Sequence, residues 1–263
     1  SSSLAEGTTI MNKLHFIFDK NKKSQKFKKK LFKKFKNFSP SKSDCIVIFG
    51  GDGFMLKNLK KYYKFNKPFY GINCGTYGFL MNKSNIDHLK RKISKSKKTT
   101  INSLSVNCSY GNGLKKNLIA INEISIFRQS KQTASLNISV GQKQIIKKLI
   151  GDGVLVSTPA GSTAYNLSVH GPILSLNSGK LAITPISPFR PRRWKGKIIS
   201  NKSIVKIKNL NSKKRPIAAV ADNIELRNVR RLTIKRNKKI NIRLLFDNNR
   251  SLVKRIKNKI KRQ

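Results

Sequence analysis

Acidic residues are scarce in this chain of 263 residues, which has 10 Asp and Glu against 58 Lys and Arg and a formal net charge of +48. The basic residues are spread over the whole length, so they favour a solvated basic surface over a localised nucleic-acid-binding arm. We therefore expect nucleic acid to bind only nonspecifically, through charge. A protein whose function is to bind nucleic acid through its basic surface is an alternative.

Cysteine and long apolar runs are scarce as well. Cys45, Cys74 and Cys108 form no Cys-x-x-Cys pair, which argues against a structural zinc site and fits a reducing cytoplasm without disulfides. No apolar run approaches the ~20 residues of a membrane span, so we expect a soluble, cytoplasmic protein that does not bind membranes. Residues 1–10 are small and polar without the apolar core of a secretory signal, and we interpret them as a leader, tag or alternative start.

Strand and helix patterns alternate over the first hundred residues. Apolar runs predict strands at 14–18, 45–49 and 69–72, and periodic apolar residues predict helices at 20–38, 54–64 and 86–94. This order predicts a parallel sheet covered by helices, in which ligands bind beyond the carboxyl ends of the strands. From about residue 99 the chain is predicted to be β-rich, with strands that include 101–107, 118–127, 154–157, 229–236 and 240–246.

The end of the chain returns to helical spacing. Leu252, Ile256 and Ile260 fall on one face of a possible helix, and we expect this tail to dock on the first domain. The predicted domains are an α/β nucleotide-phosphate domain at 11–98 plus 248–263 and a β-rich domain at 99–247.

Asp52 lies in the glycine turn Gly50-Gly51-Asp52-Gly53, directly after a predicted strand. Peptide N–H groups of such a turn favour anions, and glycine allows a phosphate to approach the backbone closely. An aspartate in this place can accept a proton from a sugar hydroxyl or hold a magnesium ion beside phosphates. The alternative is a tight turn whose aspartate caps the helix at Phe54.

A second glycine-flanked aspartate, Asp152, opens the longest motif of the chain, at residues 151–166. Here a predicted strand ends in a cluster of hydroxyl-bearing and small residues. Such a cluster offers short neutral donors and open backbone amides that suit ribose, amide and adenine groups. The alternative is a loop before a helix, with Ser162 or Thr163 as the helix cap.

Together these motifs resemble the NAD kinase family, from about residue 14 to residue 246. The form of Gly53-Phe54-Met55-Leu56 with Phe189–Trp194 is most similar to the alphaproteobacterial ATP-NAD kinases. Gly50–Gly53 alone is shared with diacylglycerol kinases, so a lipid kinase is a further alternative, against which the match at 151–165 argues. The resemblance rests on Gly50–Gly53, Gly71-Ile72-Asn73, Gly75, Gly78-Phe79-Leu80, Asn122-Glu123, Gly151–Tyr165, His170–Leu174 and Ile183–Pro188.

The resemblance implies transfer of the γ-phosphoryl group of ATP to the 2′-hydroxyl of the adenosine ribose of NAD, which gives NADP. It also implies magnesium, a Rossmann-like N-terminal domain and a β-rich NAD-binding domain at 99–247. A C-terminal segment would return to the first domain, and the protein would be a homodimer or homotetramer.

The family's motifs also imply roles for individual residues. Asp52 would be the general base or the residue that orients the hydroxyl, and the glycines Gly50, Gly51 and Gly53 would lie against phosphate. No protein ligand is assigned to magnesium. The NAD site would contain Gly53, Phe79, Asn122, Glu123, Asp152, Thr163, Ala164, Tyr165 and Ser168.

Arg190 is a candidate for neutralising the ATP phosphates, because phosphoryl transfer needs positioning and cations more than covalent help. The alternative for Arg190, Arg192 and Arg193 is a solvated basic turn stiffened by Pro188 and Pro191.

Overall fold

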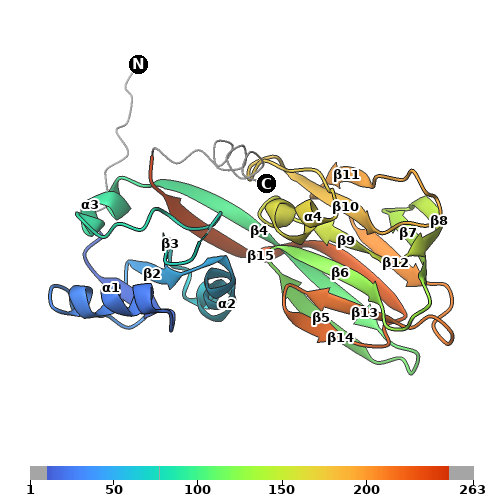
Figure 1. Ribbon diagram of the computed structural model, residues 1–263, viewed down its shortest axis with the longest axis horizontal. Coiled ribbons are helices and arrows are strands. Elements are labelled where there is room, and N and C mark those ends of the chain that lie inside the picture. The colour runs from blue at the N-terminus through green and yellow to red at the C-terminus, as the bar shows by residue number, and fades with distance from the viewer. Residues whose placement is uncertain (1–10, 77, 249–263) are drawn as a thin grey trace, which may run out of the picture. The chain divides into compact units, whose positions relative to one another are not determined.

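The computed structural model describes residues 11–76 and 78–248, which form two compact units (Figure 1). The first unit contains the described residues up to Thr100 and from Asn241, and the second contains Ile101–Ile240. The leader predicted at 1–10 and the apolar stripe predicted at 252–260 lie outside the described residues. No helix among the described residues is both long and apolar enough to cross a membrane.

The first unit is built on the predicted parallel sheet. Strands β1 (Leu14–Phe18), β2 (Cys45–Gly50) and β3 (Phe69–Asn73) pair in that order, and the end of β15 (Arg231–Phe246) pairs with β3 through Leu244 and Phe69. All six residues of β2 are buried, as expected for a central parallel strand covered on both faces. The carboxyl end of β2 therefore delivers the glycine motif to the edge where α/β sheets bind ligands.

Helices α1 (Lys22–Phe32) and α3 (Leu89–Ser94) of the first unit are shorter than predicted, and α2 (Asp52–Tyr62) begins two residues earlier than predicted. Helix α1 is capped by the side chain of Asn21, which accepts the Ser24 N–H at 2.9 Å. The chain leaves the helix before Phe35, whose ring still packs 6.0 Å from that of Phe16, so that Phe27 and Phe35 both lie partly buried against the core. A 3-10 turn, η1 (Tyr63–Phe65), follows α2.

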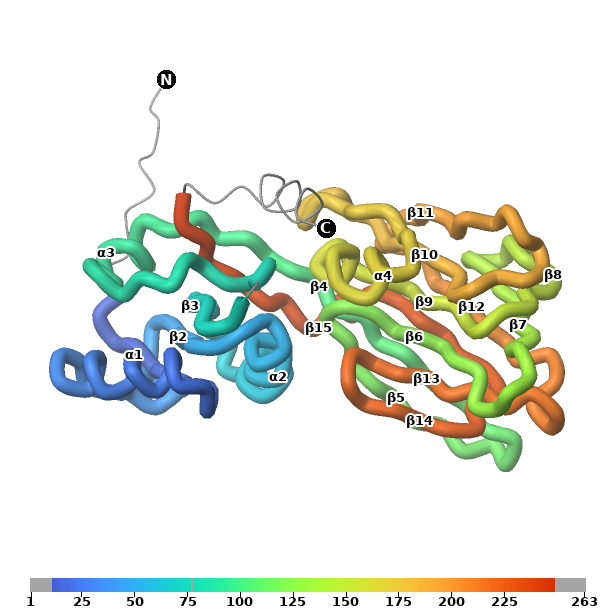
Figure 2. Tube along the Cα trace, in the orientation of Figure 1, coloured from blue at the N-terminus to red at the C-terminus, as the bar shows by residue number. Residues whose placement is uncertain are grey.

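The second unit consists of antiparallel strands around one aliphatic core. One sheet contains β12 (Val205–Asn209), β7 (Ala134–Val140), β8 (Lys143–Gly151), β5 (Lys115–Ala120) and the parts of β4 (Lys97–Ser109) and β15 that lie in this unit. The other has the order β11 (Lys197–Ser200), β10 (Lys180–Ile186), β9 (Gly153–Ser157), β6 (Glu123–Arg128), β13 (Ile217–Ala221) and β14 (Ile224–Leu226). Figure 2 shows β6, β9 and β10 side by side.

Three strand predictions differ from the structure, those at 118–127, 229–236 and 240–246. The strand predicted at 118–127 is interrupted between β5 and β6, because Asp222 accepts the backbone N–H groups of Ile121, Asn122 and Glu123 at 2.9, 2.8 and 3.3 Å. The strands predicted at 229–236 and 240–246 are instead one strand, β15. Strands β11 and β14 were not predicted from the sequence.

Candidate functional site

Asp52 is the first residue of α2, but its carboxylate does not cap this helix. Oδ2 accepts the backbone N–H of Phe79 at 2.7 Å and Oδ1 accepts that of Leu80 at 3.0 Å. The N-cap position belongs to Gly51, which makes no side-chain cap bond. The helix-cap alternative is therefore wrong, and both carboxylate oxygens hold the segment that follows β3. The structure thus brings Asp52 and Phe79 together, as the predicted site requires.

The three glycines of the first motif have different surroundings. A Cβ on Gly50 would lie 2.6 Å from the Phe54 ring, whereas a Cβ on Gly51 or Gly53 would meet nothing within 4 Å. Gly50 is therefore required by packing against Phe54. Gly51 and Gly53 instead leave the backbone at the start of α2 open to another molecule.

The segment after β3 is fixed to the glycine motif at a second point. The Cys74 N–H donates to the Gly50 carbonyl at 2.8 Å, and the side chain of Asn73 accepts the Gly75 N–H at 3.0 Å. Phe79 is half-buried at the end of this segment. The first unit therefore presents a rigid group of a carboxylate, open backbone and one aromatic ring.

In the second unit, strand pairing brings the other predicted residues together. Strand β6 pairs with β9 so that Glu123 lies opposite Ser157 and Phe127 lies opposite Gly153. The hydroxyl-rich segment then packs directly on Asn122, whose carbonyl oxygen would be only 2.2 Å from a Cβ on Gly161. Asn122-Glu123 and residues 151–165, which are far apart in the sequence, thus form one surface.

The Asp222 carboxylate holds Asn122 and Glu123 by accepting their backbone N–H groups. The sequence argument missed Asp222. The only available signal was the scarcity of acids, since Asp222 is one of 10 in the chain. Asn122 Oδ1 is buried and accepts no hydrogen bond from the described residues. A buried acceptor of this kind is costly unless a ligand satisfies it. Glu123 is also nearly buried, at 8% exposure.

Asp152 is oriented by an arginine that was not predicted. Arg128 Nε donates to Asp152 Oδ1 at 2.5 Å, and the Arg128 N–H donates to the Asp152 carbonyl at 2.9 Å. A further bond of 2.7 Å, from Arg128 Nη1 to the Ser130 carbonyl, fixes the guanidinium. In a chain with 58 basic residues, no sequence signal distinguished Arg128, because its role depends on the pairing of β6 with β9.

Tyr165 lies close to both acids of this surface. Burial raises the pKa of Tyr165 above its usual 10.0, and the negative charges of Asp152 and Glu123 raise it further. The phenol therefore stays protonated at neutral pH and can donate a hydrogen bond. Its ring lies 5.8 Å from that of Phe127, which limits its movement.

The remaining predicted residues, in 163–168, range from buried to exposed. Thr163 is buried in the 3-10 turn η2 (Gly161–Thr163), Ala164 occupies the N-cap of α4 (Tyr165–Ser168), and Ser168 is exposed at its end. The capping alternative for Ser162 is wrong, because its hydroxyl donates to the Pro159 carbonyl at 2.7 Å and accepts the Leu174 N–H at 3.0 Å.

Arg190 is exposed, and its guanidinium lies 5.4 Å from the centre of the Phe189 ring. Its carbonyl accepts the Ile150 N–H at 2.8 Å, which places its backbone beside the strand that leads to Asp152. The arginine head group forms no hydrogen bond or ion pair with another described residue. It is therefore available to an anionic ligand.

No group of three or more His, Cys, Asp or Glu side chains within residues 11–76 and 78–248 lies close enough to hold a metal ion. The three cysteines are buried as free thiols. Burial raises the pKa of the Cys74 and Cys108 thiols to about 11 and that of Cys45 further still. These thiols are therefore poor nucleophiles at neutral pH.

Two family models match the chain, those of the ATP-NAD kinase N-terminal domain at residues 4–98 and C-terminal domain at residues 121–235. The NAD kinase of Zymomonas mobilis is 44% identical over 93% of this chain and 96% of its own length. Those of Rickettsia bellii and Brucella melitensis are 41% and 42% identical over 94% and 92% of this chain, and 96% and 95% of their own lengths. The similarity to alphaproteobacterial members is thereby confirmed.

Solved structures show the same fold at low sequence identity. A yeast NADH kinase complexed with NADH aligns with a TM-score of 0.80 and 20% identity, over 96% of this chain and 88% of the yeast chain. An NAD kinase from Archaeoglobus fulgidus in complex with ATP aligns with a TM-score of 0.73 and 22% identity, over 95% of this chain and 97% of its own. The predicted combination of a Rossmann-like first domain and a β-rich second domain is confirmed.

Proposed function

Because the chain belongs to the ATP-NAD kinase family, we infer that it is an NAD kinase, which transfers the γ-phosphoryl group of ATP to the 2′-hydroxyl of the adenosine ribose of NAD. Relatives matched over more than nine tenths of the chain carry this name. The lipid kinase alternative depended on Gly50–Gly53 alone, and we reject it because the NAD kinase relatives match nearly the whole chain.

We propose that Asp52 accepts the proton of the 2′-hydroxyl or orients that hydroxyl for attack. The observation that carries this role is the pair of bonds from the Phe79 and Leu80 N–H groups to its carboxylate. A carboxylate held at both oxygens loses little entropy when the hydroxyl arrives, and general base catalysis contributes about 10²–10⁴-fold. The open backbone at Gly51 and Gly53 would receive phosphate oxygens.

The second unit would hold NAD. We propose that Asn122 Oδ1, a buried acceptor, receives the amino group of adenine, and that Glu123 accepts a ribose hydroxyl. Asp152, Thr163, Ala164, Tyr165 and Ser168 would line the rest of this site, with the Tyr165 phenol as a donor. Arg190 would neutralise phosphate charge, which its exposed guanidinium permits.

Magnesium would enter with ATP. The described residues offer no cluster of protein ligands, and the Asp52 carboxylate already accepts two N–H groups. The described residues therefore do not fit a magnesium site made of protein ligands. Mg²⁺ that is bound mainly through substrate phosphates and water needs few protein ligands. We assign no step to a protein-bound metal.

Three free buried cysteines support a reducing compartment, and we propose that the protein acts in the cytoplasm. We also propose a homodimer or homotetramer, following the family resemblance. Light scattering coupled to size-exclusion chromatography would measure the mass in solution, and a monomeric mass with full activity would contradict the proposal.

The activity is tested by incubating the purified chain with ATP, magnesium and NAD and measuring NADP by a coupled dehydrogenase assay. We expect NADP to form, with no phosphorylation of diacylglycerol in a parallel reaction. Reactions with polyphosphate as donor and with NADH as acceptor would define the two substrates. Failure to form NADP with any donor would contradict the assignment.

A further inference from the structure

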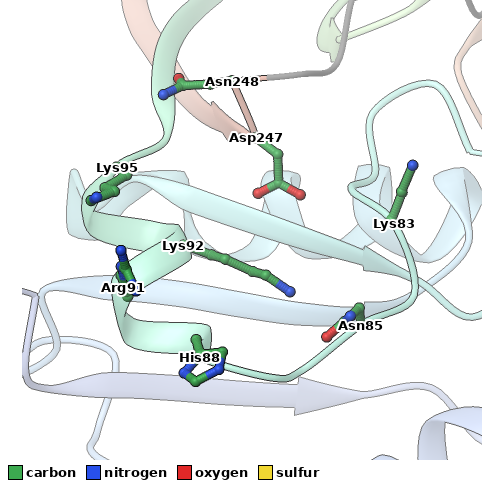
Figure 3. Close-up of a pocket in the computed structure, with 8 residues that line it drawn as sticks. All are labelled: Lys83, Asn85, His88, Arg91, Lys92, Lys95, Asp247 and Asn248. Atoms are coloured by element: carbon green, nitrogen blue, oxygen red, sulfur yellow. The ribbon is translucent and has the colours of Figure 1, made fainter.

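The first unit contains a cavity of about 460 Å³ between the segment 83–95 and the end of β15 (Figure 3). None of its lining residues belongs to Gly50–Gly53 or to the second unit. Its volume is within the range of small-molecule sites. Basic side chains dominate its lining, namely Lys83, His88, Arg91, Lys92 and Lys95.

The positive charges in this cavity are not compensated by the protein. The side chains of Lys83, Arg91, Lys92 and Lys95 form no hydrogen bond or salt bridge with other residues in the described part of the chain. Arg91 and Lys95 are four residues apart around α3, a spacing at which like charges destabilise a helix. In Figure 3 Lys92 extends across the cavity and Lys83 lies on its opposite side. An anion between Lys92 and Lys83 would compensate their two positive charges.

One carboxylate also faces the cavity, that of Asp247 (Figure 3). The Tyr70 hydroxyl donates to Asp247 Oδ1 at 2.5 Å, and the Asp247 N–H donates to the side chain of Asn82 at 3.0 Å. Asp247 is thereby held both at one carboxylate oxygen and at its backbone. Oδ2 accepts no hydrogen bond from another residue that the structure describes.

The carboxylate restricts the chemistry of the ligand. A purely phosphate-bearing anion would place negative charge beside Asp247, which repels it. A ligand that also carries a hydroxyl can present phosphate to the cations and donate the hydroxyl hydrogen to Asp247 Oδ2. Aspartate is a common partner of sugar hydroxyls in nucleotide sites for the same reason.

We propose that this cavity binds a phosphorylated sugar, with its phosphate groups at Lys83, Arg91 and Lys92 and a ring hydroxyl at Asp247. A free sugar phosphate and the ribose phosphate of a nucleotide share this chemistry. The site is separate from every residue that we assign to NADP formation, so it does not depend on the proposed function.

The test is isothermal titration calorimetry at about 150 mM salt, where screening suppresses nonspecific attraction. Fructose 1,6-bisphosphate and AMP are the two sugar phosphate probes, and pyrophosphate is the phosphate-only probe. We expect at least one sugar phosphate to bind with a Kd below about 1 mM. AMP can also enter the proposed NAD site, so only binding that the cavity variants weaken identifies the source, as a free sugar phosphate or a nucleotide.

Substitutions in the cavity test whether the ligand binds there. The triple substitution Lys83→Gln, Arg91→Gln, Lys92→Gln should weaken sugar phosphate binding by about tenfold or more, because charge-assisted bonds to phosphate are lost. The matched control removes three exposed lysines of the second unit, by Lys115→Gln, Lys116→Gln and Lys143→Gln, and should change the Kd by less than about twofold. Unfolding midpoints would confirm that both variants are folded.

Asp247→Asn tests the hydroxyl contact. It should weaken sugar phosphate binding while leaving pyrophosphate binding unchanged or tighter, since the Tyr70 hydroxyl can still donate to the amide oxygen. Equal effects of the two triple substitutions, no binding of either sugar phosphate, or a parallel loss of pyrophosphate binding in Asp247→Asn would overturn the proposal.

Discussion

The two glycine-flanked aspartates occupy similar sequence positions but different environments. Asp52 follows a parallel strand in the first unit, and neutral backbone N–H groups of Phe79 and Leu80 hold its carboxylate. Asp152 lies between two antiparallel strands in the second unit, and the Arg128 guanidinium holds its carboxylate. Both Asp152 and Arg128 have side chains that are 38% exposed.

This difference separates their chemistry. Backbone N–H groups of Phe79 and Leu80 position the Asp52 carboxylate, as its proposed role toward the 2′-hydroxyl requires. The Arg128 guanidinium fixes the orientation of the Asp152 carboxylate, as its proposed contact with substrate requires. On the proposed roles, the same short motif serves catalysis in one unit and substrate binding in the other.

The largest expected effect is that of Asp52→Asn, which should lower kcat for NADP formation by about 10³-fold, because the amide cannot accept a proton. It should also destabilise the protein by about 1–3 kcal/mol, since the new amide N–H₂ would face the N–H of Phe79 or Leu80. Steady-state kinetics and denaturant unfolding would measure the two effects. Asp87→Asn, at an exposed acid of the same unit, is the control and should match the unmodified protein. A kcat for Asp52→Asn within tenfold of the unmodified value would remove Asp52 from catalysis.

The glycines beside the two aspartates should respond in opposite ways. A Cβ on Gly153 would lie 1.9 Å from the Ile126 carbonyl oxygen, so Gly153→Ala should destabilise the protein by about 3 kcal/mol. Gly53→Ala should keep or slightly raise the unfolding midpoint, because alanine favours the helix by about 1 kcal/mol. It should still slow NADP formation, since the methyl group would occupy the space proposed for phosphate. Equal unfolding midpoints for the two variants would contradict the packing difference.

Alkaline stability should depend on the buried thiols, of which Cys74 and Cys108 give one test in each unit. Burial raises the pKa of Cys74 and Cys108 from 9.0 to about 11. Above pH 9.0 the unfolded thiols ionise while the folded thiols stay protonated, so stability is full below that pH and falls as pH rises towards about 11. Each thiol should contribute a loss of about 2 kcal/mol by about pH 10.5. Urea unfolding of Cys74→Ala and Cys108→Ala should therefore show a weaker pH dependence than the unmodified protein shows, and an unchanged slope in both would contradict the expectation.

The smallest expected effect concerns the partner of Asp152. Arg128→Gln should raise the KM for NAD by about fivefold with little change in kcat, because Asp152 loses its orientation. The stability change should stay below about 1 kcal/mol, as for other solvent-exposed ion pairs. Arg227→Gln removes another exposed pair, with Glu225, and should leave KM unchanged. A drop in kcat without a change in KM would place Arg128 in the chemical step instead.

Local patterns were sufficient to predict the elements that carry the motifs. The run 45–49 followed by Gly50–Gly53 identified a buried strand and a helix start, and residues 151–166 identified a second strand and a short helix. These features depend on neighbours in the sequence, so apolar periodicity and glycine placement report them.

The contacts that complete the candidate site are long-range. Asp52 is bonded to residues 27 and 28 positions away, and Asp222 to residues 99 to 101 positions away. The Arg128–Asp152 pair depends on the register of β6 and β9. Sequence spacing contains no information on register or on which distant carboxylate a backbone N–H will meet, so these contacts required the structure.

Strand β15 has a consequence for synthesis of the protein. Its residues up to Ile240 belong to the second unit, and those from Asn241 belong to the first, where Leu244 pairs with β3. The sheet of the first unit therefore lacks its β15 strand until residue 246 has been translated. The N-terminal unit cannot complete its sheet while the ribosome is still adding the second unit, and a nascent chain that stops before residue 241 leaves an edge of β3 uncovered.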